Sequence, residues 1–297
     1  LVALASTQMP GFTTAQVAAL TTAQLAAIET ADLAALSTVQ LRGLASTQVA
    51  GLTTAQVANL TTAQLAGIAS TQVQGLTTAQ IANMGTAQMA GLGTAQVNAL
   101  SSVQVPALTT AQLGQFSTTQ LGGISTAGIK GMTTAQLAAL TTAQITGFGT
   151  AQVGALTTTQ VAAIETADLA VMTTTQLRAL ASGQAAALTT AQVANLTTTQ
   201  VAGLASTQLG GLTSTQGGAI TTAQAAALSS AQVATLSTNA AKGLTTAAVA
   251  ALDTNQIKGL TTAQIAALST AQVAAIETAD LAAMTTAQLP GFTTAQV

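Results

Sequence analysis

The sequence predicts an all-α solenoid of very short helices, with one helix in each copy of an eight-residue repeat. Three observations predict this fold: an unbroken octapeptide register, large apolar residues three positions apart, and helix-capping residues at the start of each copy. From Ala5 to Phe292 the chain divides into 36 consecutive octapeptides with the consensus Thr-Thr-Ala-Gln-Val-Ala-Ala-Leu. Residues 1–4 and 293–297 continue the register as partial copies. Residues 1–297 are therefore expected to form a single continuous array.

The apolar spacing favours helix over strand. Position 8 of the octapeptide is Leu, Ile, Met or Phe in all 36 copies, and position 5 is a large aliphatic residue in 32 of them. Residues three apart share a face of a helix, whereas a strand needs a period of two. An eight-residue repeat drifts by roughly 80° per copy around a continuous helix. Each copy is therefore expected to be one short helix followed by a turn, with positions 5 and 8 in the core.

The first residues of each copy match a helix N-terminus. Ser or Thr at position 1 with Gln at position 4 is the pattern of a capping box, and position 4 is Gln in 30 copies. Where position 1 is Ala, position 2 is Ser, so a hydroxyl cap is still expected there. These copies begin at Ala5, Ala45, Ala69, Ala181 and Ala205.

Charges are sorted along the octapeptide as a helix dipole favours. All acids lie at positions 1 and 4: Glu29, Asp32, Glu165, Asp168, Asp253, Glu277 and Asp280. All bases lie at position 6: Arg42, Lys130, Arg178, Lys242 and Lys258. This sorting also predicts that positions 1, 4 and 6 face solvent. Position 7 is nearly always Gly, Ala or Asn, which indicates a need for a small residue or for a left-handed C-terminal cap, as at Asn59 and Asn195.

A β-solenoid with two or three octapeptides per coil is the alternative fold. Pro10, Pro106 and Pro290 all occupy position 6, where a helix interior would lose a hydrogen bond. Thr also favours strands. Residues 50–52 and 205–208 resemble the octapeptides of bacterial ice-nucleation proteins, a family that forms β-solenoids. The Tyr and Thr-x-Thr positions of that family are absent here.

Composition excludes several classes of function. Only 4% of the residues are charged, and the chain has no Cys, His, Trp or Tyr. Zinc sites of the usual kind, thiol nucleophiles and imidazole bases are thus absent from the sequence. Five scattered basic residues do not suit nucleic acid, and polar residues interrupt every apolar run before a membrane span is reached. We predict no enzyme activity, no catalytic, cofactor-binding or metal-ligating residue, and no cofactor.

The paired acids of the sequence are a candidate cation site. Three Glu-Thr-Ala-Asp tetrads, at 29–32, 165–168 and 277–280, each place two carboxylates three residues apart. Two carboxylates are too few ligands for Ca²⁺, and stabilisation of a first helical turn explains them. The sequence therefore predicts no metal site at the tetrads.

A structural, self-associating protein is the predicted function. The net charge of −2 gives little repulsion between chains. Neither end has a polar capping copy, so we expect a segment of a longer array or a protomer whose ends meet another chain. The array resembles the long Thr- and Ala-rich repeat regions of giant bacterial surface proteins, which implies an adhesin-like filament or stalk that is extracellular or at the cell surface. The alternative is a ligand-binding solenoid that presents its Thr and Gln columns to ice, glycan or another surface.

Position 5 also predicts where the array is weakest. It lacks a large aliphatic residue at Gly217 and Ala225, in adjacent copies, and at Ala185 and Ala241. We expect the fastest local opening between about Thr213 and Leu228, because buried methylene groups are lost there. Replacing Gly217 with Val is expected to slow this opening.

Overall fold

The structure, a computed structural model, describes residues 6–297. Within this range every octapeptide contains one short helix, giving 33 α-helices, three 3₁₀ helices and no strand. The predicted all-α solenoid with one helix per octapeptide is confirmed. The β-solenoid alternative is wrong, because residues 6–297 pair no backbone as strands.

The chain divides into two compact units, Leu1–Ala155 and Leu156–Val297, which are built in the same way. The elements of the first unit are η1 (Ser6–Gly11), α1 (Thr14–Ala18), α2 (Thr22–Ala26), α3 (Thr30–Ala34), α4 (Thr38–Arg42), α5 (Ser46–Ala50), α6 (Thr54–Ala58), α7 (Thr62–Gly67), α8 (Ser70–Gly75), α9 (Thr78–Asn83), α10 (Thr86–Ala90), α11 (Thr94–Asn98), η2 (Val105–Ala107), α12 (Thr110–Leu113), α13 (Thr118–Gly123), α14 (Thr126–Gly131), α15 (Thr134–Ala138), α16 (Thr142–Ile145) and α17 (Thr150–Ala155).

The elements of the second unit are α18 (Thr158–Ala163), α19 (Thr166–Val171), α20 (Thr174–Arg178), α21 (Ser182–Ala185), α22 (Thr190–Asn195), α23 (Thr198–Gly203), α24 (Ser206–Gly210), α25 (Ser214–Ala219), α26 (Thr222–Ala227), α27 (Ser230–Thr235), α28 (Thr238–Gly243), α29 (Thr246–Ala250), α30 (Thr254–Gly259), α31 (Thr262–Ala267), α32 (Thr270–Ala274), α33 (Thr278–Ala282) and η3 (Leu289–Gly291). None of the helices among the described residues is long and apolar enough to cross a membrane.

Each α-helix begins at position 2, and the N-cap residues described for the α-helices are in extended conformation. In α6, Thr53 has φ −72° and ψ 156°, its hydroxyl accepts the Gln56 N–H at 3.1 Å, and Gln56 Oε1 accepts the Thr53 N–H at 2.8 Å. This confirms the predicted capping box. The five bases lie in last helical turns, as the charge pattern predicts.

The three prolines coincide with the three 3₁₀ helices. Pro10 lies in η1, Pro106 in η2 and Pro290 in η3. Proline has no N–H, so the bond from position 6 back to position 2 cannot form. Shorter bonds remain, such as the one from Ala107 N to Gln104 O at 3.1 Å. Because most of the α-helices end at position 6 or 7, the array accommodates proline by tightening one turn.

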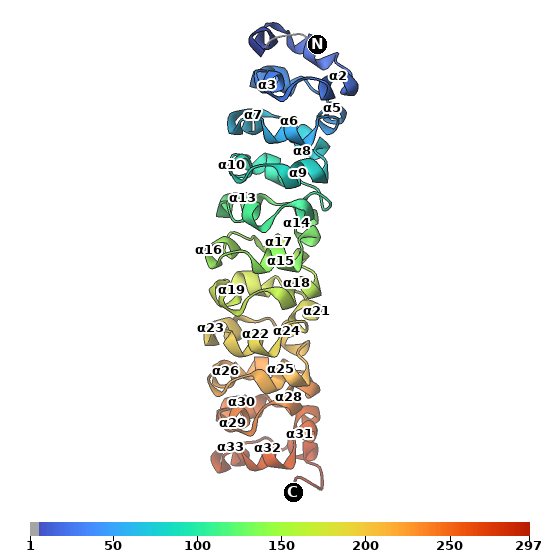
Figure 1. The fold of residues 1–297 in the computed structure, drawn as a ribbon. Helices are drawn as coiled ribbons and strands as arrows, with labels where there is room; N and C mark the ends of the chain where they lie inside the picture. The colour runs from blue at the N-terminus through green and yellow to red at the C-terminus, as the bar shows by residue number, and fades with distance from the viewer. Residues whose placement is uncertain (1–5) are drawn as a thin grey trace. The chain divides into compact units, whose positions relative to one another are not determined.

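Helices three copies apart pack together and define the coils. In the first unit α4 packs on α1 and α7 on α4, and in the second α23 packs on α20 and α26 on α23. Figure 1 shows the helices of successive coils lying one above another within each unit. Hydrogen bonds join residues 25, 28 and 31 apart. One coil is therefore about 28 residues, or three and a half octapeptides, and two coils contain seven.

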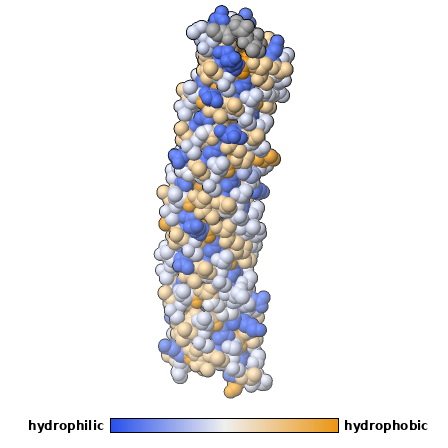
Figure 2. Space-filling view, in the orientation of Figure 1, coloured by the Kyte–Doolittle hydropathy of each residue, from blue (hydrophilic) through white to orange (hydrophobic). Residues whose placement is uncertain are grey.

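Positions 5 and 8 form the core of each unit, as predicted. Val57 and Leu65 at position 5 and Leu60 at position 8 are buried, and the same holds for nearly every copy. Positions 3 and 6, mostly Ala or Thr, face solvent. The face in Figure 2 is accordingly white to tan over most of its area, with single strongly hydrophilic residues scattered across it.

Position 7 is small because of close packing between coils. No residue in 6–297 has a positive φ, so the predicted left-handed caps are wrong. Asn59 has φ −93°, and its Nδ2 donates to Ala55 O at 2.8 Å; Asn195 bonds Ala191 O in the same way. A Cβ on Gly75 would instead lie 2.4 Å from the main-chain oxygen of Ser46, at position 2 of the coil before.

Two further expectations are corrected. Ala45, Ala69, Ala181 and Ala205 are themselves the N-caps of helices that begin at the following Ser, so that Ser supplies no cap, although each Ala N–H still bonds the Gln at position 4. The fifth such copy begins at Ala5, outside the described residues. A Cβ on Gly217 would lie 2.1 Å from Ala240 O, so Val at this position is expected to destabilise the unit rather than slow its opening.

The packing of position 7 can be tested with a matched pair of glycines. Gly75→Ala is expected to lower the free energy of unfolding by roughly 1–3 kcal/mol, because the main chain of Ser46 must move. Gly91→Ala is the control, since its Cβ would have no contact shorter than 3.4 Å. It is expected to be neutral or to stabilise by about 0.4–1 kcal/mol. Equal effects of the two substitutions on urea unfolding would contradict this account of position 7.

Candidate functional site

The buried polar side chains of the described residues are the Gln and Asp residues at position 4. The sequence predicts that position 4 faces solvent, and the structure corrects this. Gln112, for example, is only 2% exposed. A buried amide needs partners for both its oxygen and its nitrogen. The column of position-4 residues is therefore the one place in each unit where polar chemistry is concentrated inside the fold.

Gln112 uses both ends of its amide. Oε1 accepts the N–H of Thr109, the N-cap of its own helix, at 2.7 Å. Nε2 donates to Ile81 O at 2.9 Å and to Met84 O at 2.7 Å, in the coil before. These carbonyls belong to positions 5 and 8 of an earlier copy, where the helix ends. Ile81 O also accepts the N–H of Met84 in its own copy, at 3.2 Å. One side chain therefore caps the start of one helix and the end of another.

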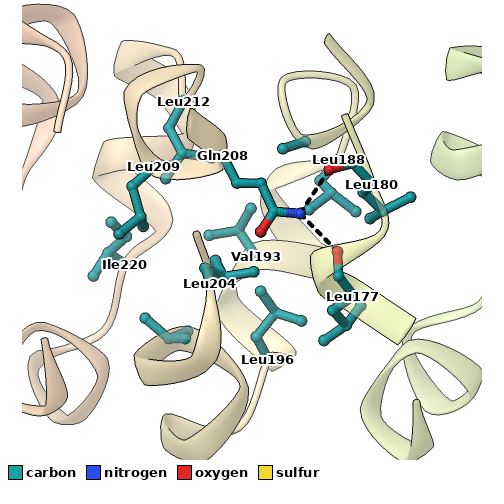
Figure 3. A pocket seen from close by; sticks show the side chains of 12 residues that line it. Leu177, Leu180, Leu188, Val193, Leu196, Leu204, Gln208, Leu209, Leu212 and Ile220 are labelled. Carbon is teal, nitrogen blue, oxygen red and sulfur yellow. Dashed lines mark hydrogen bonds between the residues drawn. The ribbon is translucent and has the colours of Figure 1, made fainter. Parts of the chain in front are cut away.

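The same arrangement repeats through both units, and we call it the glutamine ladder: the position-4 Gln side chains together with the N-cap N–H groups and the position-5, position-6 and position-8 carbonyls that they bond. In Figure 3, Gln208 reaches between the Leu177 and Leu180 carbonyls, with Nε2 to O distances of 2.6 and 2.8 Å. Apolar side chains surround it, including Val193 and Leu196.

Glutamine fits this position better than its relatives. Glu has the same length and could accept the N-cap N–H, but an ionised carboxylate has no hydrogen to donate to the carbonyls. Asn has both groups but is one methylene shorter. The octapeptide pattern predicts the capping half of this role and does not predict the donor half. The missed signal is the use of Gln in 30 copies and Glu in none at position 4.

The core beside the ladder is closely filled. A cavity of about 20 Å³ lies within the second unit, lined by Ala185 and neighbouring Leu and Val side chains at positions 5 and 8 (Figure 3). A space of this size takes a water molecule at most. This cavity therefore does not provide a site for an organic ligand.

Three copies have a small residue in place of the ladder Gln. They are Gly128, Ala240 and Ala248. Their helices keep a hydroxyl N-cap, from Ser125, Ser237 and Thr245 respectively. The link to the coil before is lost with the amide.

In the acidic tetrads, Asp takes the place of the ladder Gln at position 4. Asp32, Asp168 and Asp280 are buried, while Glu29, Glu165 and Glu277 are N-cap residues whose side chains make no capping bond. Asp280 Oδ1 accepts the hydroxyl of Thr254 at 2.5 Å. Among residues 6–297 no group of three or more His, Cys, Asp or Glu side chains is placed to hold a metal ion.

Asp168 is the least satisfied of these carboxylates. It is 2% exposed, and its Oδ2 has no hydrogen-bond partner among the described residues. Burial, with a smaller contribution from the charge of Glu165, raises the pKa of Asp168 above its ordinary value of 3.8. Folding therefore shifts this carboxyl toward its protonated form relative to the unfolded chain.

The chain is a helical solenoid protein. In most of its repeats, a Gln side chain links a short helix to the coil before it. The ALTTAQ repeat family matches residues 25–62, 82–110, 107–142, 129–163, 161–198, 241–270 and 273–297. These matches span most of the sequence, and the chain belongs to the ALTTAQ repeat family. The six letters of that description occur, for example, at residues 19–24, where they include an N-cap Thr and the position-4 Gln. No curated protein matches the chain.

The donor half of the ladder is tested by Gln112→Glu. The carboxylate keeps the bond from Thr109 N–H but faces the carbonyls of Ile81 and Met84 without a hydrogen. We expect a loss of about 3–5 kcal/mol in the free energy of unfolding at neutral pH, as for an uncompensated buried charge. Gln16→Glu is the control, because Gln16 is exposed and makes the same N-cap bonds. A loss at Gln16 as large as at Gln112 would refute the donor role.

The raised pKa of Asp168 predicts a pH dependence of stability. Between the ordinary pKa and the raised one the folded state binds more protons, so the free energy of unfolding falls as pH rises through this window. Asp168→Asn removes this loss. Its melting temperature should exceed that of the unmodified chain by roughly 2–4 °C at pH 7, with the gain fading below about pH 4.

Asp253→Asn provides the comparison for Asp168→Asn. Asp253 is an exposed N-cap that accepts the Gln256 N–H at 2.8 Å, and Asn caps helices equally well. Little change in melting temperature is expected for it. A pH-independent gain for Asp168→Asn, or no gain at all, would contradict the assignment.

Proposed function

We propose that this chain is a structural, non-catalytic repeat protein that serves as a stalk or filament at the cell surface or outside the cell. The observation that carries the proposal is the glutamine ladder. Its amides are used up inside the fold to join coil to coil, as at Gln80, Gln112 and Gln208. Amide groups that are hydrogen-bonded inside the fold cannot also bind a substrate. This fits a protein whose role is structural.

Modular construction supports the same function. Each ladder Gln contacts only the coil before its own, so a unit is stabilised by nearest-neighbour terms. Adding octapeptides extends such a structure without any new kind of contact. A protein that must reach a set length gains from this property, whereas a catalyst needs one unique site.

The exposed surface supports association between chains. Positions 3 and 6 present mostly Ala and Thr, and only twelve charges are spread over 297 residues. Low net charge favours association of folded proteins. The extracellular location is proposed from the resemblance to Thr- and Ala-rich repeat regions of bacterial surface proteins.

The burial of Gln weakens the alternative proposal of a ligand-binding surface made of exposed Thr and Gln side chains. That alternative required Thr and Gln to face outward together, and most of the Gln residues are buried in the ladder. Many of the position-1 hydroxyls are engaged as N-caps, for example at Thr53 and Thr109. Structural roles thus account for much of the Thr and Gln repetition.

Electron microscopy and sedimentation of the folded full chain test the proposal. We expect thin, uniform fibres at micromolar concentration. A variant with Ala58→Lys, Ala82→Lys and Ala90→Lys, at exposed position-6 sites that tolerate bases elsewhere in the array, should remain folded by circular dichroism but stay dispersed. The same three sites changed to Gln should still assemble. Dispersed monomers of the unmodified chain, or fibres from the Lys variant equal to those of the control, would contradict assembly through this surface.

A further inference from the structure

The glutamine ladder is interrupted in two successive copies of the second unit. Position 4 is Ala240 in α28 and Ala248 in α29. On either side the ladder is present. Gln232 donates to Ala202 O at 2.9 Å, and Gln256 donates to Ala225 O at 2.8 Å. We call the contact of residues 237–252 with residues 209–220 the ladder gap.

The carbonyls that face the gap have lost their amide donors. In a regular copy the position-8 carbonyl accepts Nε2 from the Gln 28 residues later, as Met84 O does from Gln112. The corresponding carbonyl for Ala248 is that of Ile220, to which no described residue donates. For Ala240 it is that of Leu212, which accepts the Ser237 hydroxyl at 2.7 Å instead. One side-chain bond thus replaces the links that two ladder Gln residues would make.

Close backbone packing takes the place of the amides. A Cβ on Gly217 would lie 2.1 Å from Ala240 O, and a Cβ on Gly243 would overlap the main chain of Ser214. α25 and α28 therefore meet through residues with little or no side chain. Such a contact is short, but it gains little apolar burial per residue, and Gly217 and Gly218 lose more backbone entropy on folding than other residues.

We propose that the ladder gap is a built-in opening point, at which the second unit separates locally before its glutamine-tied coils do. Regular coils must break several amide-to-carbonyl bonds to part, and each carbonyl they expose loses a buried partner. Separation of the two coils at the gap breaks one hydrogen bond, from the Ser237 hydroxyl to Leu212 O. It also lets Ile220 O accept a hydrogen bond from water. The energetic barrier to local opening is therefore lowest there. The gap is a property of the hydrogen-bond pattern, and its test is separate from that of the proposed function.

Hydrogen exchange of the intact, folded chain, read by mass spectrometry, tests the inference. Amides in residues 213–220 and 237–252 should exchange roughly tenfold faster than those in the regular segments 189–204 and 261–268. Equal or slower exchange at the gap would overturn the proposal.

A second gap made elsewhere gives an independent test. Gln192 and Gln200 lie in successive copies and bond Val161, Ile164, Leu169 and Met172 carbonyls. The double change Gln192→Ala with Gln200→Ala should bring exchange in 161–172 and 189–204 to the rate at the natural gap, leaving 253–276 unchanged. Thr199→Ala, at an exposed position 3, is the control and should leave all rates unaltered. Exchange in the double variant equal to that of the unmodified chain would overturn the role of the ladder in setting where the unit opens.

Discussion

The fold depends on one amide group that joins two helix ends. Helices of four to six residues are far below the length at which a helix is stable alone, and each leaves N–H groups at its start and carbonyls at its end without helical partners. Gln at position 4 supplies an acceptor to the first and a donor to the second. In Gln112 the acceptor Oε1 and the donor Nε2 belong to the same amide group. Without this donor, Met84 O at position 8 loses its amide partner, and Ile81 O at position 5 keeps only the bond from the Met84 N–H.

The reach of that amide sets the distance between coils and so constrains the other positions. The Nε2 of Gln72 donates to the carbonyls of Leu41 and Leu44. These bonds hold the helix that contains Gln72 close to the coil before it. Gly75 then lies against Ser46, with no space for a Cβ. The requirement for small residues at position 7 follows from this proximity. Positions 5 and 8 fill the interior that remains.

Local features of this fold could be predicted from the sequence, and long-range ones could not. Helix type, the capping box at residues such as Thr53 and Gln56, and the inward direction of Val57 and Leu60 depend on residues within one octapeptide. The burial of position 4 depends on carbonyls 28 and 31 residues away, and capping alone already accounted for a Gln there. Small residues at position 7 fitted either a left-handed turn or close packing. Only the neighbouring coil decides between them, as Asn59 and Gly75 demonstrate.

A coil of three and a half octapeptides has a consequence for how such arrays change over time. Within a unit the side of the solenoid that a copy occupies is set by its number modulo seven, because two coils hold seven copies. Duplicating a single octapeptide would move all later copies to different sides of the solenoid. Duplicating seven octapeptides would leave each later copy on the side that it occupied before. The tetrads at 165–168 and 277–280 in the second unit are 112 residues apart, which is four coils of 28. Their buried carboxylates, Asp168 and Asp280, therefore lie at about the same angular position, and a chemical feature placed there by in-phase duplication stays roughly aligned along the axis of that unit.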